Sequence, residues 1–348
     1  MTRRRATETL LRATRAGAGV ILALLSFGAM ATPAGEEVPR VERLSPVLDA
    51  LVPPDAAIDV IATGFEWAEG PLWLESEQTL VFSDVPANTV FAWREGEGVT
   101  EWLKPSGYTG DRPRGGEPGA NGLALDSEGR LLLAQHGDRQ VARLAASLAE
   151  PRPVFETVAS HFRGKRFNSP NDLTVDSAGN VWFTDPPYGL EGGVDDPARE
   201  LDTFGVYRVA TDGTVTLVVD DLSRPNGIGL SPDEATLYVA NSDPERAVWM
   251  AYDVAGDGSV SGGRLLFDAT TAVPDAPGLP DGLEVHPSGH LFATGPGGVL
   301  VLSPAGDLLG RIVTGSAAAN VAFDADHATL YVTADDRVLR VRLGGGTR

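Results

Sequence analysis

Six oxygen-bearing side chains recur along the chain, each directly before a short apolar run that has the composition of a β-strand. They are spaced by 52, 50, 55, 55 and 39 residues, and they are Glu69, Asn121, Asn171, Asn226, Asp281 and Asn320. Four of the eight asparagines in the chain occupy these positions. Carboxylate and amide oxygens are the ligands that hard divalent cations prefer, so a converging set of such groups could bind one.

Asparagine and aspartate are also common turn residues, because they tolerate a positive φ. Two observations argue against a turn role for the whole set. The hairpin turn of each unit is expected several residues later, for example at 127–129 and 177–180. In addition, the first position is occupied by Glu69, although glutamate is a poor turn former. We therefore interpret the six residues as converging ligands.

The segments that carry these residues resemble one another, which indicates an internal repeat. Each has the polar residue, an apolar run, a turn and a second apolar run, as in ANGLALDSEGRLLLAQ from Ala120 and PNDLTVDSAGNVWFTD from Pro170. Further apolar runs lie between these segments, which makes about four short strands per unit, and no convincing amphipathic helix follows the N-terminal region. Six four-stranded units of this length predict an all-β fold, a six-bladed β-propeller.

Rotation about a propeller axis relates equivalent positions, so the six side chains should converge on the central channel, where we expect a metal site. Two carboxylates and several amide oxygens favour Ca²⁺, which takes six to eight oxygen ligands. Mg²⁺, Mn²⁺ and Zn²⁺ are alternatives; Zn²⁺ fits least, because the chain has no cysteine and no histidine pair at ligand spacing. The ring should close by pairing of the terminal run 337–343 with the run 58–62, which removes exposed sheet edges.

The N-terminus has the features of a secretory signal peptide. Five arginines precede or border the small apolar run 16–27, and the tripeptide at 29–31 resembles a cleavage site. We expect residues 1–31 to be removed, residues 32–54 to lead into the fold, and residues 55–348 to form the propeller. The mature protein is then expected to be periplasmic or secreted, without disulfides because it has no cysteine.

The chain is strongly acidic, with a formal net charge of −20. Removal of the signal, which holds five arginines and one glutamate, makes this −24. Such a charge disfavours a nucleic-acid partner and, after signal cleavage, an anionic membrane surface. Small neutral substrates or cations are compatible with it.

Several motifs resemble those of the SMP-30/gluconolactonase/luciferin-regenerating-enzyme family. They are AEGPLW (68–73), SPNDLTVDSAGNVWFTDP (169–186), RPNGIGLSPDEATLYVANS (224–242) and PDGLEVHPSGHLFATG (280–295). The resemblance implies a six-bladed propeller with one catalytic divalent ion on its axis, usually Ca²⁺. It implies Glu69, Asn226 and Asp281 as metal ligands. Asn171 matches a residue that binds the metal in some members and the substrate in others.

The segment GANGLALDSEGRLLLAQHGDRQVAR (119–143) resembles the bacterial gluconolactonase-like branch. The activity we expect is hydrolysis of a lactone, a small-molecule substrate, with Asp281 as general base and with Asn121 and Asn171 positioning the substrate. His136 is either a substrate hydrogen-bond donor or a structural turn residue. Two alternatives remain: a calcium-dependent phosphotriesterase, and a non-enzymatic binding propeller whose ion is structural.

Two long loops, 104–120 and 185–205, are expected to shape the mouth of the channel, because long connections in compact folds are often functional. Candidate contact residues are Tyr108, Arg114, Tyr188 and the pair Trp67 and Trp73, of which Trp73 also suits the core.

Overall fold

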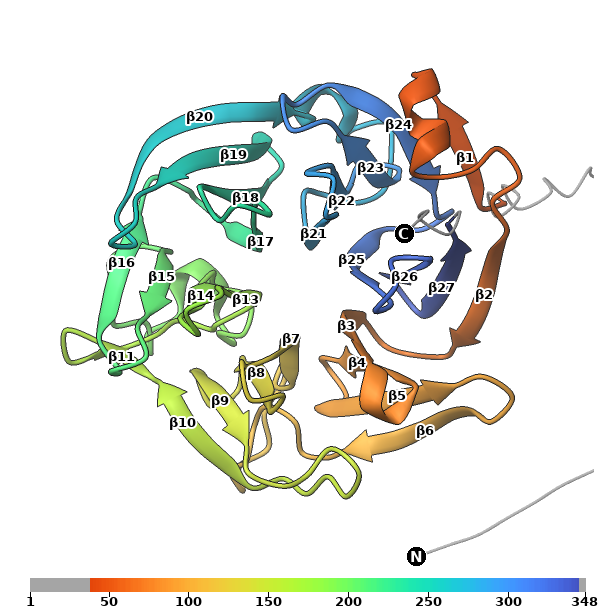
Figure 1. Cartoon of the computed structure of the whole chain (residues 1–348). Helices are drawn as coiled ribbons and strands as arrows, with labels where there is room; N and C mark the ends of the chain where they lie inside the picture. The colour runs from red at the N-terminus through yellow and green to blue at the C-terminus, as the bar shows by residue number, and fades with distance from the viewer. Residues whose placement is uncertain (1–37, 344–348) are drawn as a thin grey trace, which may run out of the picture. The chain divides into compact units, whose positions relative to one another are not determined.

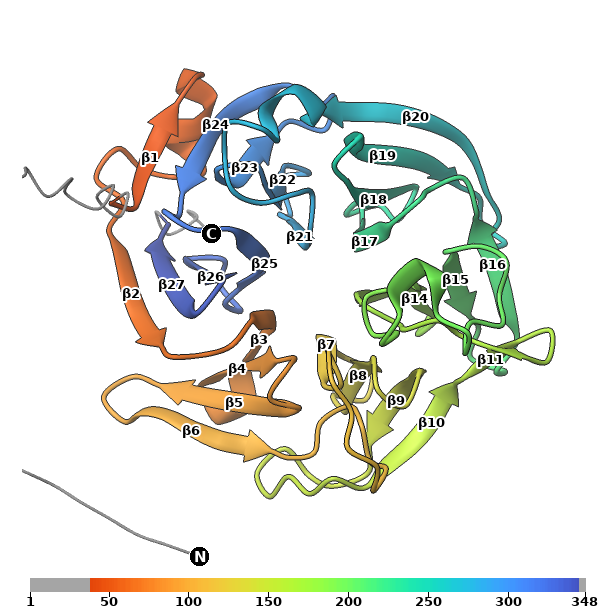
Figure 2. The ribbon, with the colours of Figure 1, turned by 180° about the vertical axis from the view of Figure 1, so that it is seen from behind.

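Strands make up nearly all the regular structure of the computed structural model, which describes residues 38–343. Six sheets, each of four or five strands, are arranged around a central axis, and the innermost strand of each sheet is the one that carries or closely follows a repeated polar residue (Figures 1 and 2). The predicted six-bladed β-propeller is therefore confirmed. The predicted signal peptide, residues 1–31, lies outside the described residues.

The first three blades follow the chain without interruption. The first blade contains β3 (Ala68–Leu74), β4 (Thr79–Asp84), β5 (Thr89–Arg94) and β6 (Gly98–Leu103). The second contains β7 (Ala120–Leu125), β8 (Leu131–Gln135), β9 (Gln140–Leu144) and β10 (Phe155–Ala159). The third contains β13 (Leu173–Val175), β14 (Val181–Thr184), β15 (Val206–Val209) and β16 (Val215–Val219).

The last three blades include two strands from the N-terminal part of the chain. The fourth blade contains β17 (Pro225–Leu230), β18 (Thr236–Asp243), β19 (Arg246–Val254) and β20 (Val260–Asp268). The fifth contains β21 (Leu283–Val285), β22 (Leu291–Gly295), β23 (Gly298–Leu302), β24 (Leu308–Val313) and β1 (Arg40–Arg43). The sixth contains β25 (Ala318–Phe323), β26 (Thr329–Ala334), β27 (Arg337–Arg342) and β2 (Ile58–Thr63).

The remaining elements are short. A two-stranded ribbon and four 3₁₀ helices connect or flank the blades: β11 (His161–Phe162), β12 (Lys165–Arg166), η1 (Pro46–Ala50), η2 (Glu75–Glu77), η3 (Gly193–Asp195) and η4 (Thr270–Ala272). No helix among the described residues is long and apolar enough to cross a membrane.

The ring closes as the sequence predicts. Strand β2 pairs antiparallel with β27, with Ile58 opposite Val341 and Thr63 opposite Arg337. The N-terminal part of the chain thereby completes the last blade, and the first and sixth blades meet as neighbours rather than leaving open edges.

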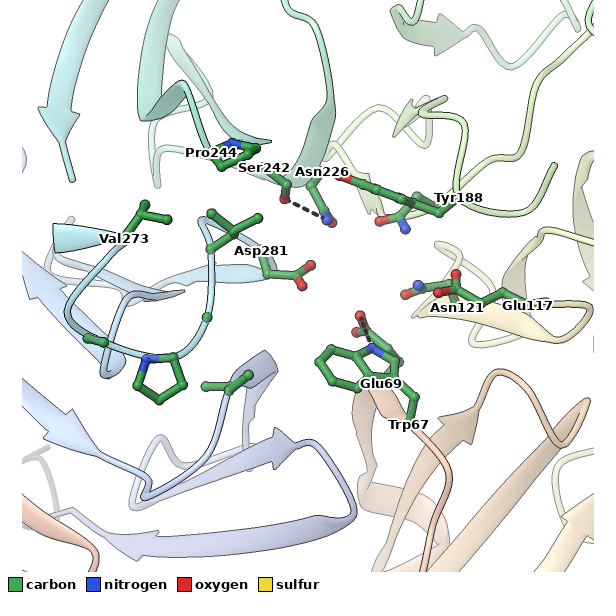
Figure 3. Close-up of a pocket in the computed structure, with 17 residues that line it drawn as sticks. Trp67, Glu69, Glu117, Asn121, Tyr188, Asn226, Ser242, Pro244, Val273 and Asp281 are labelled. Atoms are coloured by element: carbon green, nitrogen blue, oxygen red, sulfur yellow. Dashed lines mark hydrogen bonds between the residues drawn. The ribbon is translucent and has the colours of Figure 1, made fainter. Parts of the chain in front are cut away.

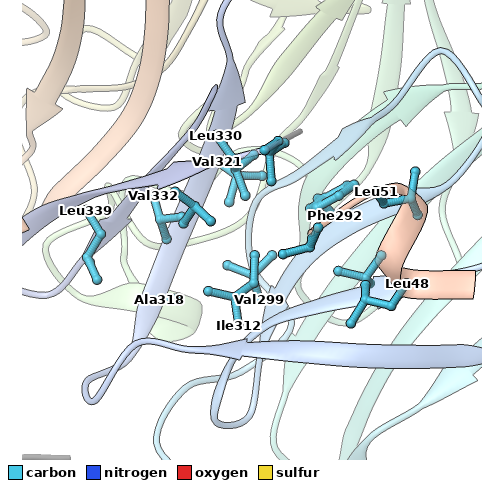
Figure 4. Packing of buried hydrophobic residues seen from close by; sticks show 14 of the residues in the cluster. Leu48, Leu51, Phe292, Val299, Ile312, Ala318, Val321, Leu330, Val332 and Leu339 are labelled. Carbon is cyan, nitrogen blue, oxygen red and sulfur yellow. The ribbon is translucent and has the colours of Figure 1, made fainter. Parts of the chain in front are cut away.

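The segment expected to lead into the fold also contributes to a blade. Strand β1 pairs antiparallel with β24, and the 3₁₀ helix η1 places Leu48 and Leu51 on the fifth and sixth blades. Figure 4 shows these leucines beside Phe292 and near Leu330, in a cluster between blades. Burial of apolar surface stabilises such inter-blade clusters by about 25 cal/mol per Å².

Candidate active site

Five of the six predicted side chains line one cavity of about 490 Å³ at the central axis. Glu69, Asn121 and Asn226 lie near the starts of β3, β7 and β17, while Asn171 and Asp281 lie just before β13 and β21. The labelled members of this set point toward one another from different blades (Figure 3). Propeller rotation brings them together although they are about 50 residues apart in the chain.

Asn320 does not line this cavity. The prediction that it takes the sixth equivalent position was therefore wrong, by one residue. Backbone hydrogen bonds between neighbouring blades show the correct register. Gly122 N donates to Asn171 O (2.7 Å), and Gly282 N donates in the same way to Ala319 O (2.7 Å). Ala319 therefore occupies the sixth position. Because successive side chains of a strand face opposite ways, Asn320 points away from the cavity.

Asn320 and Asp172 occupy equivalent places in a second, smaller cavity of about 80 Å³ on the same axis. Oδ1 of Asp172 accepts a hydrogen bond from Leu173 N (2.9 Å), and Oδ2 accepts one from Ile228 N (3.4 Å) in the next blade. Asp172 thus joins the third blade to the fourth.

Three carboxylates line the larger cavity, and two of them, Glu69 and Asp281, have no cationic partner among the described residues. Glu69 is 2% exposed and accepts hydrogen bonds from Trp67 Nε1 (3.3 Å) and Gly70 N (3.2 Å). Burial raises the pKa of Glu69 to about 8, and the nearby Asp172 carboxylate adds to the effect. Burial and the Glu69 carboxylate likewise raise the pKa of Asp281 well above its usual value. Among the described residues, no lysine or arginine lines this cavity.

Four buried oxygens of cavity residues have no hydrogen-bond partner: Oδ1 of Asn121, Oδ1 of Asn171, Oδ1 of Asp281 and the hydroxyl oxygen of Tyr188. Buried polar atoms are nearly always paired, so such a concentration indicates a place for a ligand. The described residues contain no cluster of three or more His, Cys, Asp and Glu side chains arranged for a metal. The oxygen set here instead combines two carboxylates with amide groups, which is a donor set suited to Ca²⁺.

Asn226 is held by a neighbouring hydroxyl. Its Nδ2 donates a hydrogen bond to Ser242 Oγ (2.9 Å), and Ser242 Oγ in turn donates to the carbonyl oxygen of Pro280. Sequence reasoning did not identify Ser242. Its position at the end of the strand segment VANS offered only a weak signal.

His136 is fully buried and lies behind Asn171 rather than on the cavity wall. Its Nε2 is 3.3 Å from Asn171 Nδ2, and its Nδ1 is 3.3 Å from Glu117 Oε2. Glu117 lines the cavity and was also missed. It lies in the loop 104–120, whose length was the only sign of a functional role.

The other predicted contact residues divide into two groups. Tyr188 and Trp67 line the cavity, as expected. Arg114 instead donates to the carbonyl oxygens of Gly137 and Gly189 and lies over the Tyr108 ring, 5.6 Å from its centroid, so this pair holds the loop. Trp73 stacks on Tyr331 with ring centroids 5.5 Å apart, away from the cavity.

Comparison with known proteins supports the sequence resemblance. Residues 67–336 match the model of the SMP-30/Gluconolactonase/LRE-like region. A gluconolactonase of Zymomonas mobilis is 38% identical over 319 residues, which cover 88% of this chain and 87% of that protein. The pentonolactonase XacC of Haloferax volcanii is 29% identical, covering 79% of this chain and 83% of that protein.

Solved structures give the same result. A gluconolactonase from Xanthomonas campestris superposes with a TM-score of 0.75 at 33% identity, covering 90% of this chain and 99% of that one. A luciferin-regenerating enzyme shares the fold, with a TM-score of 0.64 at 21% identity, covering 89% and 96% of the two chains. Because the family model matches most of the chain and the sequence relatives span nearly its whole length, the protein belongs to the SMP-30/gluconolactonase/LRE-like family of β-propellers.

Proposed function

We propose that this lactone-hydrolysing enzyme opens sugar lactones with the help of one divalent cation, Ca²⁺ by preference. The lactonases among its relatives support the reaction class. The observation that carries the metal proposal is the set of unpartnered buried oxygens beside the carboxylates of Glu69 and Asp281. A cation would neutralise these carboxylates, whose pKa values are raised by burial and by the neighbouring acidic groups.

Four side chains would hold the ion: Glu69, Asn171, Asn226 and Asp281. All four line the same cavity and come from four different blades, so the rigid ring keeps their separation constant. When bound, such an ion supplies Lewis-acid polarisation of a carbonyl group and stabilises developing negative charge on oxygen.

Asp281 is the residue we assign as general base. Its Oδ1 is buried, unpartnered and at the cavity, so it can accept a proton from the attacking water. The water oxygen bonds to the lactone carbonyl carbon, the ring C–O bond breaks, and the proton held by Asp281 passes to the departing ring oxygen. The product is an open-chain hydroxy acid.

Asn121 and Asn171 are suited to position the substrate. The unpartnered Oδ1 of Asn121 can accept a hydrogen bond from a lactone hydroxyl group. His136 acts on the substrate only through Asn171, because it lies behind that residue.

Hydrolysis of gluconolactone and of a pentonolactone by the purified protein tests the proposal, before and after treatment with a chelator. We expect hydrolysis to stop in the chelator and to return when Ca²⁺ is added. Full activity of a protein shown by metal analysis to be free of cations would contradict the metal role. Failure to open either sugar lactone in the presence of Ca²⁺ would contradict the substrate class.

A further inference from the structure

The cavity has two chemically different walls. Glu117, Asn121 and Tyr188 form a polar side, whereas the segment 273–279, between η4 and β21, forms an apolar one with Pro244 and Ala317. Figure 3 shows the two sides: Val273 and Asn121 lie on opposite sides of the Asp281 carboxylate. Among the described residues of 273–279 that face the cavity, none has a polar side chain: they are Val273, Ala276, Pro277, Gly278 and Leu279.

The apolar wall is anchored to the fifth blade. The backbone N–H of Gly297 donates a hydrogen bond to the carbonyl oxygen of Pro277 (2.7 Å). Gly278 has a φ of +98° and lies so close to the backbone that a Cβ atom there would be 2.9 Å from Gly295 O. Three prolines within 274–280 further restrict the backbone. The wall is therefore a preformed surface and not a loose loop.

A simple sugar lactone does not use such a wall. Its ring carries hydroxyl groups on most carbons, and a hydroxyl placed against Val273 or Leu279 would lose its hydrogen bonds to water without gaining a partner. The polar side and the proposed metal ligands account for the groups that a small hydroxylated ring needs. At about 490 Å³, the cavity also falls in the range of sites for ligands larger than a monosaccharide.

We propose that the enzyme also hydrolyses lactones that carry an apolar substituent, and that the wall of 273–279 binds this substituent while the lactone carbonyl faces Asp281. The inference rests on the proposed lactone hydrolysis and names a further substrate class for the same site. The substituent would bind because its alkyl or aryl surface is removed from water at the apolar wall. The polar side of the cavity, opposite this wall, would hold the reacting ester group.

A homologous series of six-membered lactones tests this inference. The series starts with the unsubstituted ring and adds straight alkyl chains of increasing length, with gluconolactone as reference. Each methylene that becomes buried should raise kcat/KM by about fourfold until the wall is covered. A flat or falling kcat/KM along the series, with gluconolactone still hydrolysed, would overturn the inference and leave the proposed function intact. Hydrolysis of no lactone in the series, gluconolactone included, would overturn both.

Two substitutions connect the effect to the wall. Val273→Thr keeps the side-chain shape but adds a hydroxyl, and Leu279→Asn replaces an apolar side chain with a polar one of similar size. Both should reduce the rise of kcat/KM with chain length. This rise is a ratio of two kcat/KM values for the same variant, so it does not depend on the amount of folded enzyme. Leu265→Asn is the matched control, because Leu265 is 56% exposed on β20 and does not line the cavity. An unchanged rise in both wall variants would overturn the assignment.

Discussion

The imidazole Nε2 of His136 lies 3.3 Å from the side-chain nitrogen of Asn171, in a fully buried contact directly behind the cavity. On the other side of the ring, Nδ1 lies 3.3 Å from Oε2 of Glu117. The charge of this carboxylate favours a proton on Nδ1, although no hydrogen bond joins the two groups, and a proton there leaves Nε2 to accept a hydrogen bond from the Asn171 amide. The amide is then oriented with its oxygen, which has no partner in the protein, toward the cavity.

Glu117→Gln should therefore weaken binding of the proposed cation. Loss of the carboxylate removes the group that fixes the histidine tautomer, and loss of such outer partners commonly costs about 10–100-fold in metal affinity. Calcium affinity measured by calorimetry checks this directly. Glu150→Gln, at an exposed turn position, is the control. Equal affinities of the two variants would show that Glu117 does not orient Asn171.

Glu69→Gln should separate cation binding from folding. Without a cation, the native protein buries this carboxylate unpaired, so the neutral amide should leave the cation-free melting temperature unchanged or higher. The rise in melting temperature that Ca²⁺ gives the original protein should be lost. Thermal melts with chelator and with Ca²⁺ measure both quantities, with Glu66→Gln as an exposed neighbouring control. A Ca²⁺-dependent rise that survives in Glu69→Gln would argue against Glu69 as a ligand.

Asp281→Asn should lower kcat by about 10²–10⁴-fold, because the amide cannot accept the proton of the attacking water. The matched control is Glu284→Gln, three residues further along, which lies in the smaller cavity and should leave kcat nearly unchanged. Steady-state kinetics on one sugar lactone provide the comparison. A variant with full kcat would remove Asp281 from the mechanism.

Gly282→Ala tests the register of the sixth blade. A Cβ atom on Gly282 would overlap the side chain of Asn320, so the substitution should destabilise the fold by about 1–3 kcal/mol. Asn320→Ala removes the obstructing amide, and the double variant should recover most of that loss. Urea unfolding measures each free energy. Gly256→Ala is the control, because nothing lies within 4 Å of a Cβ atom there. Additive effects of the two substitutions would contradict the contact.

Asp126 should make the fold sensitive to acid. Burial acts to raise its pKa, but hydrogen bonds from the backbone and side chain of Arg130, from Glu128 N and from Arg143 outweigh burial and lower the pKa below that of an ordinary aspartate. An acid with a lowered pKa in the folded state contributes stability above its unfolded pKa and loses it as the pH falls through the folded value.

Asp126→Asn should therefore cost about 1–3 kcal/mol of unfolding free energy at neutral pH. The difference from the original protein should shrink as the pH falls from the pKa of the unfolded side chain through the lower pKa of the folded one, because folded Asp126 then also becomes neutral. Urea unfolding over a series of pH values gives the two curves, and Asp111→Asn in an exposed loop serves as the reference substitution. A difference that does not change with pH would contradict the charge-based origin of the stability.

The sequence alone predicts the six-bladed ring, its closure between 58–62 and the terminal run, and five of the side chains that line the cavity. These features share one physical basis. The repeat places the same short motif at the start of each innermost strand. Because the blades are related by rotation about the axis, equivalent residues of different units lie close together at that axis. Asn121 and Asn171 could therefore be assigned to one cavity without any structure.

The groups that surround those five side chains depend on tertiary packing, and the sequence did not predict them. A shift of one residue turns a strand side chain to the opposite face, so the position equivalent to the other five falls on Ala319, and Asn320 faces the smaller cavity instead. Glu117 and the apolar segment 273–279 belong to connections that do not repeat, and their paths depend on anchors such as the Gly297–Pro277 hydrogen bond. Contacts of this kind have no periodic signal in the chain, because they arise from packing between segments far apart in sequence.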